Sequence, residues 1–269
     1  MYINDLPFQI NSLAEPILFA DDINVIISNG NFIDFSTSAN QVLARMIEWF
    51  SANKLVLNLE KNIYNEICNN KSTTLCTDSY KDKCIEEVVD LKFLGIQIDN
   101  RLNWRNHIDQ IIPRLSIACY MVRRMCHICN NDTLRSIYFA YFHSVVSYGM
   151  IFWGNFSRSR KIFTLQQKII RIMMGAPPRT SCRKLFKKLE ILTVPSQYIY
   201  SLISFLIVNL DKFLTNSSVH SINKRNRHHL QRPIANLSCF QKGTSHFRIR
   251  IFNNLPQCTA GVMYAISTC

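Results

Sequence analysis

The sequence lacks the features of a secreted or membrane-spanning protein. Its only long apolar run covers residues 199–210 and is interrupted by polar side chains, whereas about twenty apolar residues are needed to cross a bilayer. The first twenty residues hold neither the basic region nor the apolar core of a signal peptide. The ten Cys are scattered rather than spaced as a disulfide framework. We therefore expect free thiols, no membrane partner and an intracellular protein, nuclear or cytoplasmic, in which residues 199–210 form a buried helix.

Acidic residues are scarce in the second part of the chain. Residues 1–100 hold 7 Lys and Arg against 14 Asp and Glu, whereas residues 101–269 hold 24 against 4. An acidic segment followed by a strongly basic one is typical of a metal-binding part joined to a part that binds nucleic acid. The alternative is that the basic side chains only solvate helix surfaces.

The stretch from Pro16 to Ser28 consists of two short apolar runs with Asp21 and Asp22 between them. Ile, Val and Phe favour strands and Asp favours turns, so the pattern predicts a β-hairpin. Two adjacent carboxylates repel unless a cation shares them, and Mg²⁺ binds one or two carboxylates together with phosphates. Taken alone, the same pattern is also that of an ordinary hairpin turn.

Several segments, in order, resemble the reverse transcriptases of jockey-like non-LTR retrotransposons. Phe19-Ala20-Asp21-Asp22 is similar to the acidic hairpin of these enzymes. Further similar segments follow in the family's order over nearly the whole chain, to about Gln257. The other similar segments are Tyr2 to Pro7, Trp49 to Leu55, Leu57 to Lys61, Leu91 to Asp99, Leu102 to Ile108 and Phe247 to Pro256.

The resemblance implies an α+β fold that begins late in the polymerase. Residues 1–100 would form the C-terminal part of the palm, with the antiparallel hairpin and a helix, and residues 101–178 a helical thumb. Residues 179–257 would form a basic, mostly helical C-terminal region, and residues 258–269 are unassigned. The implied function is a fragment of an RNA-directed DNA polymerase, with RNA template and DNA primer as partners and a possible partner chain to complete the palm.

The resemblance also implies roles for individual residues. Asp21 and Asp22 would bind Mg²⁺ as catalytic residues, and Lys61 would lie near the departing pyrophosphate, although Asn62 stands where Thr or Ser is usual. Phe93, Leu94 and Gly95 would form the primer grip, whose backbone meets the primer 3′ end. The alternatives are an exposed lysine at a strand end and an ordinary strand over residues 92–98.

Helical periodicity begins after Trp104 and predicts three helices. In the first, one apolar stripe is formed by Ile108, Ile111, Ile112, Leu115, Ala118, Cys119 and Val122. The second covers Thr133 to Tyr148 and the third Phe163 to Met174. The candidate nucleic-acid-binding residues lie on or after these helices and are Arg105, Arg114, Arg123, Arg124, Lys168, Arg171, Arg183, Lys184, Lys187 and Lys188.

Two other interpretations of the chain follow from the same residues. It could be a non-catalytic nucleic-acid-binding protein derived from the polymerase, or a helical interaction module with no nucleic-acid role. Cys126 and Cys129 have the spacing of half a zinc site, but no second ligand pair lies at a suitable distance, so we expect them to be structural.

We predict that this chain alone does not extend a DNA primer on an RNA template with Mg²⁺. The sequence holds no upstream acidic strand, nucleotide pocket or fingers of the family pattern to complete two-metal catalysis. A primer-extension assay of the purified chain measures this. Extension that is abolished by Asp21→Ala would contradict the prediction.

Overall fold

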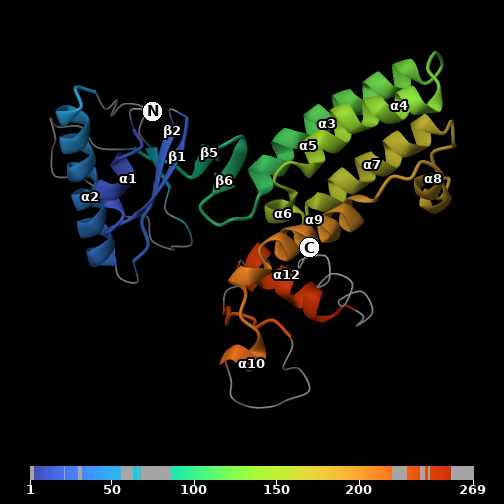
Figure 1. The fold of residues 1–269 in the computed structure, drawn as a ribbon. Coiled ribbons are helices and arrows are strands. Elements are labelled where there is room, and N and C mark those ends of the chain that lie inside the picture. Colours follow the sequence, from blue (N-terminus) through green and yellow to red (C-terminus); the bar gives the residue numbers. More distant parts are fainter. Residues whose placement is uncertain are drawn as a thin grey trace. The chain divides into compact units, whose positions relative to one another are not determined.

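The computed structural model describes residues 3–20, 22–29, 32–55, 63–65, 67, 86–219, 229–236, 240–241 and 243–255. The chain divides into two compact units, Met1–Leu91 (unit 1) and Lys92–Cys269 (unit 2) (Figure 1). Helices and strands both occur, which confirms the α+β class. The assignment of the segments to palm, thumb and C-terminal region stays a prediction.

The described residues of unit 1 form a hairpin, two helices and two very short strands. Its elements are α1 (Leu6–Ile10), β1 (Glu15–Phe19), β2 (Asp22–Ile26), α2 (Phe32–Ala52), β3 (Ile63–Tyr64) and β4 (Glu86–Glu87). Strands β1 and β2 pair antiparallel, and β3 and β4 pair parallel. In Figure 1, α1 lies between α2 and the β1–β2 hairpin.

The core of unit 1 is small and is built around Leu6, Trp49 and Phe50. Residues 6–10, just before the hairpin, form helix α1. Leu6 and Ile10 are one helical turn apart and both are fully buried, so packing against α2 explains this turn. The indole of Trp49 donates a hydrogen bond to the Asp5 carboxylate at 3.3 Å.

Helix α2 is followed by a residue in the left-handed conformation. Lys54 adopts it, with φ of 55°. The amide of Leu55 donates to the Phe50 carbonyl and that of Lys54 to the Ser51 carbonyl. These two bonds form a Schellman motif, which satisfies carbonyls at the helix end.

Unit 2 is a hairpin followed by packed helices, and its first strand starts just before the unit boundary. Its elements are β5 (Asp90–Phe93), β6 (Ile96–Asp99), α3 (Arg105–Met125), α4 (Asn131–Ile137), the π-helix η2 (Tyr138–His143), α5 (Ser144–Ser147), α6 (Met150–Trp153), α7 (Ser159–Met173), α8 (Arg183–Lys188), α9 (Val194–Val208), the 3₁₀ turn η3 (Leu210–Lys212), α10 (Asn216–Val219) and α12 (Thr244–Asn253). None of the helices in the described ranges is long and apolar enough to cross a membrane.

The predicted helices of unit 2 are present with shifted ends. The apolar stripe of α3 is buried except for Ile112, which is partly buried, and Arg105, Arg114, Arg123 and Arg124 are exposed. The second helix is a continuous run from Asn131 to Ser147 that begins where the Asn130 side chain accepts from the Thr133 amide at 2.9 Å. The third helix, α7, begins at Ser159, four residues earlier than expected.

Two other expectations for unit 2 are wrong. Residues 92–98 are not one strand, because Leu94 and Gly95 have φ of 44° and 83° and form the turn between β5 and β6. The apolar run at residues 199–210 is not one buried helix. Residues 199–208 belong to α9, which is buried on one side only, since Val208 is 80% exposed, and Leu210 begins η3.

A buried amide, Gln166 on α7, joins three segments of unit 2. Its Nε2 donates to the Tyr138 hydroxyl and to the Leu192 carbonyl, both at 2.9 Å, and its Oε1 accepts from the Val194 amide at 2.8 Å. Gln166 is 2% exposed. Burial raises the pKa of Tyr138 to about 12, so its hydroxyl stays protonated.

Helix α12 is held on the rest of unit 2 by polar side chains as well as by apolar packing. Thr244 donates to the Ile151 carbonyl at 2.8 Å. The Asn253 amide accepts from the Leu230 amide at 3.0 Å and donates to the Leu230 carbonyl at 2.9 Å. The segment that contains Leu230 is thereby held on α12, beside a small core of Leu206, Ile249 and Phe252.

We predict that Gln166→Met destabilises unit 2 by about 3 kcal/mol, because a buried N–H, C=O and hydroxyl each lose a partner. The measurement is the free energy of unfolding in urea, followed by helical circular dichroism. The control is Gln167→Met on the same helix, whose side chain is partly exposed and which we expect to change stability by less than about 0.5 kcal/mol. Equal effects of the two substitutions would contradict the role assigned to the buried amide.

Candidate nucleic-acid interface

The acidic hairpin has the predicted strand–turn–strand form. Phe19 pairs with Asp22 at the last position of the ladder, and Ala20 takes a left-handed conformation with φ of 54°. Asp22 begins β2 and is exposed, whereas Asp21 lies outside the described residues. Lys61 also lies outside them. No cluster of three or more His, Cys, Asp or Glu that could hold a metal occurs within the described ranges.

The residues expected to form a primer grip lie at a hairpin turn that is docked on the helices of unit 2. Phe93 ends β5, and Leu94 and Gly95 form the turn. The Tyr148 hydroxyl donates to the Leu94 carbonyl. Gly149 has φ of 60°, a left-handed conformation that favours glycine, and a Cβ there would lie 2.5 Å from Ile96 Cδ1.

The described cations of α3, α7 and α8 do not all face one way. Arg114 and Arg123 are nine residues apart on α3, so they project from opposite sides of that helix. Burial raises the pKa of the Cys119 thiol to about 11. Arg123 and Lys168 both lie near this thiol, and their positive charges act in the opposite direction by favouring the thiolate. The structure therefore brings Arg123 of α3 and Lys168 of α7 to the same side.

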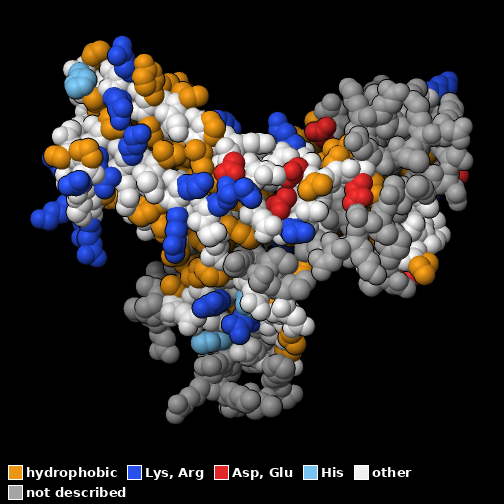
Figure 2. Space-filling view, turned by 180° about the vertical axis from the view of Figure 1, so that it is seen from behind, with side chains coloured by type: hydrophobic (Ala, Val, Ile, Leu, Met, Phe, Trp, Pro, Cys, Tyr) orange, Lys and Arg blue, Asp and Glu red, His pale blue; other side chains and the backbone are white. Residues whose placement is uncertain are grey.

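Helix α8 packs on the Phe163 side of α7 and adds four exposed cations. Its apolar residue Phe186 is buried and stacks on Phe163 of α7, with ring centroids 6.4 Å apart. We call the following set the basic surface: Arg123, Lys168, Arg183, Lys184, Lys187 and Lys188, all of which are exposed. Figure 2 shows Lys and Arg gathered over the end of unit 2 that carries α8 and α4, while the Asp and Glu of that face lie away from it.

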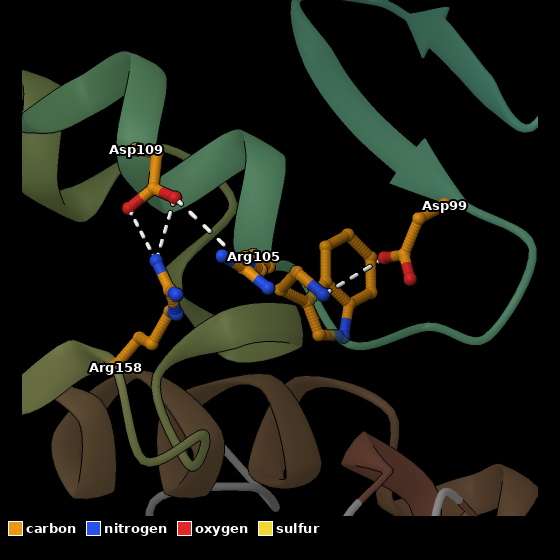
Figure 3. Close-up of polar contacts among 5 residues, drawn as sticks. Asp99, Arg105, Asp109 and Arg158 are labelled. Atoms are coloured by element: carbon orange, nitrogen blue, oxygen red, sulfur yellow. Dashed lines mark hydrogen bonds and ion pairs between the residues drawn. The ribbon is translucent and has the colours of Figure 1, made fainter.

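Two carboxylates of unit 2 pair with arginines outside the basic surface. Asp109 accepts from Arg158 Nη1 at 2.7 and 2.6 Å, and it lies 3.9 Å from Arg105 Nε (Figure 3). Glu190 lies 3.6 Å from Arg135. Arg105 is thus paired with Asp109, and Arg171 donates to the Thr180 carbonyl at 2.8 Å. Within the described part of the chain, no carboxylate forms an ion pair with the basic surface.

Asp99 shapes the turn into α3 and is structural. Its carboxylate accepts from the Trp104 amide at 2.9 Å and from the Asn103 amide at 3.0 Å, and Figure 3 shows Asp99 directed at the start of the helix. These bonds hold Leu102 and Trp104 at positive φ of 51° and 56°, a conformation that costs energy for residues with a Cβ. The Trp104 ring stacks on Phe152.

His107 is a buried imidazole between β6 and α3. It is 4% exposed, and its Nδ1 accepts from the Gln97 amide at 3.3 Å. Its Nε2 has no hydrogen-bond partner in the described residues. Burial lowers the pKa of His107, so the folded protein holds the neutral ring.

Sequence reasoning missed several residues of this region. Arg158 could be suspected from the basic run Arg158, Arg160 and Lys161 at the start of α7. The role of Tyr148 could not be suspected, because Leu94, to which it donates a hydrogen bond, is 54 positions away. An aromatic residue at helical spacing is also typical of simple packing in the core.

No family model matches this chain, and neither the curated proteins nor the solved structures include a match to it. The resemblance to reverse transcriptases therefore stays a prediction from the ordered segments of the sequence.

We predict that unit 2 loses stability as the pH falls below the ordinary His value of 6.5. In that range the unfolded chain binds a proton at His107 that the folded chain does not, so unfolding is favoured until the lowered folded pKa is passed. His107→Gln should remove this contribution, whereas His127→Gln, at an exposed position, should keep it. Urea unfolding at several pH values measures the slope. A slope unchanged by His107→Gln would contradict the prediction.

Proposed function

We propose that unit 2 binds nucleic acid through the phosphate backbone and that the chain derives from the palm and thumb of a non-LTR reverse transcriptase. The observation that carries the proposal is the basic surface, whose six cations are exposed and have no described carboxylate partner. A positively charged surface that is not neutralised by carboxylates of the same protein attracts a polyanion.

The arrangement of this surface favours a backbone rather than a base sequence. Lysine side chains on α8 are flexible point charges, and they follow a helix only six residues long. Such charges neutralise phosphates without reading bases, so binding should be insensitive to sequence and weakened by salt.

The reverse-transcriptase origin is supported by the ordered sequence segments and by the hairpin that presents Asp22. In that assignment Asp21 and Asp22 would hold Mg²⁺, because adjacent carboxylates of a turn suit a hard cation. The ion would supply charge stabilisation at transferring phosphates. Further ligands would have to come from outside the described residues, since Asp22 belongs to no described metal-binding cluster.

A non-catalytic nucleic-acid-binding protein is the second candidate, and the same basic surface favours it. The two candidates differ in primer extension and agree in binding. A helical interaction module without a nucleic-acid role would instead use exposed apolar residues such as Tyr200 and Val208 on α9, and its binding partner would not compete with oligonucleotides.

We predict that Lys184→Gln combined with Lys188→Gln makes the dependence of duplex binding on salt less steep. If both side chains neutralise phosphates, the slope of log K against log salt changes by about 1.8 for duplex DNA. The measurement is fluorescence anisotropy of a labelled duplex over a salt series.

The matched control removes two exposed charges elsewhere in unit 2, with Lys212→Gln combined with Arg250→Gln. This control should leave the slope unchanged. Equal losses from both pairs would show that net charge rather than the basic surface determines binding, and a flat salt series would reject nucleic-acid binding by this chain.

A further inference from the structure

A cavity of about 320 Å³ lies where α6, α7, α9 and α12 meet in unit 2. Aromatic side chains from three of these helices line it, namely Phe163 of α7, Tyr198 of α9 and Phe247 of α12. Tyr198 and Phe247 stack on each other with centroids 5.9 Å apart. The volume falls within the range of small-ligand pockets, about 300 to 1,000 Å³.

The ring of Tyr198 forms part of the wall of this cavity. Its side chain is 5% exposed, and its hydroxyl oxygen is buried without a hydrogen-bond partner in the described residues. Tyr198 therefore offers its ring, rather than its hydroxyl, to a ligand in the cavity.

Polar groups at the α6–α7 end give the cavity a mixed character. Asn155 and Arg160 line it together with the aromatic rings. An amide can pair with the edge of a planar heterocycle, and a guanidinium can stack on one or bind an adjacent phosphate. Pure hydrocarbon ligands would leave both groups unused.

The cavity adjoins the basic surface through one pair of rings. Phe163 lines the cavity and also stacks on Phe186 of α8. Phe186 lies between Lys184 and Lys187 in α8, which belong to the basic surface. Phe163 thus joins the wall of the cavity to the helix that carries four cations of the basic surface.

From this arrangement we propose that the cavity binds one unpaired nucleobase of a single-stranded nucleic acid whose phosphates lie on the basic surface. The inference rests on the proposed function. Aromatic rings accept any base by stacking, while Asn155 and Arg160 meet its polar edge. Duplex nucleic acid, whose bases are stacked and paired, would use the basic surface alone.

The test compares variants that differ only in whether the altered residue lines the cavity. Ile199→Trp places a larger ring at a cavity-lining position of α9, and Val208→Trp places the same ring on α9 at an exposed residue. Arg160→Ala and Lys161→Ala remove equal charge at neighbouring exposed positions, of which only Arg160 lines the cavity. Helical circular dichroism checks that each variant is folded.

The probes are single-stranded DNA and RNA oligonucleotides that carry one 2-aminopurine, with a duplex of the same length for comparison. We expect the full chain to quench 2-aminopurine fluorescence in the single strand. Ile199→Trp should abolish the quenching and weaken single-strand binding by about tenfold, which is within the range of one stacked base. Arg160→Ala should weaken single-strand binding more than Lys161→Ala, while duplex affinity changes equally in both. The stronger of the DNA and RNA signals identifies the preferred strand.

Three outcomes would overturn the inference. If duplex and single strand bind but 2-aminopurine is unquenched, the cavity binds no base and the proposed function stands. Equal effects of Ile199→Trp and Val208→Trp would also show that the cavity binds no base, and the proposed function would stand. If neither nucleic acid binds, the proposed function fails and this inference fails with it.

Discussion

The helical part of this protein depends on the three hydrogen bonds of one buried amide. Gln166 lies at the middle of α7 and contacts the run that contains Tyr138 and the loop that leads into α9. Apolar contacts alone would allow α7 to rotate or slide, whereas a fully satisfied amide accepts one register. The positions of Lys168 on one side of α7 and of Phe163 on another follow from that register.

The second constraint is the scarcity of carboxylates. Residues 101–269 contain four, and Asp109 and Glu190 are used to pair with arginines. Asp109, near the start of α3, accepts a hydrogen bond from Arg158 in the segment before α7. This ion pair therefore stabilises the fold. The cations that remain on α8 have no such task, and this division explains why they are the best candidates for contact with a polyanion.

The sequence predicted those features that depend on local pattern and missed those set by distant contacts. The buried stripe of α3 and the β1–β2 hairpin follow from periodicity, because Ile108, Leu115 and Val122 repeat at helical spacing. The turn at Leu94 did not follow, because a Leu at positive φ is unfavourable by itself and is held by the bond from Tyr148. Helix α1 is short and depends on burial against Trp49. The cations of the candidate site were identified from composition. The directions in which they point could not be predicted, because these depend on how α3, α7 and α8 pack.

The two candidate sites differ in how much of each is supplied by the described residues. The acidic hairpin provides one exposed carboxylate, Asp22, beside a small core in unit 1. The basic surface and the neighbouring cavity are built entirely from described residues of one unit, whose core runs continuously from Trp104 to Leu202. Metal-dependent chemistry needs several ligands placed together, whereas backbone binding needs only cations on a stable support. The proposed binding and the proposed catalysis therefore depend on different residues of this chain.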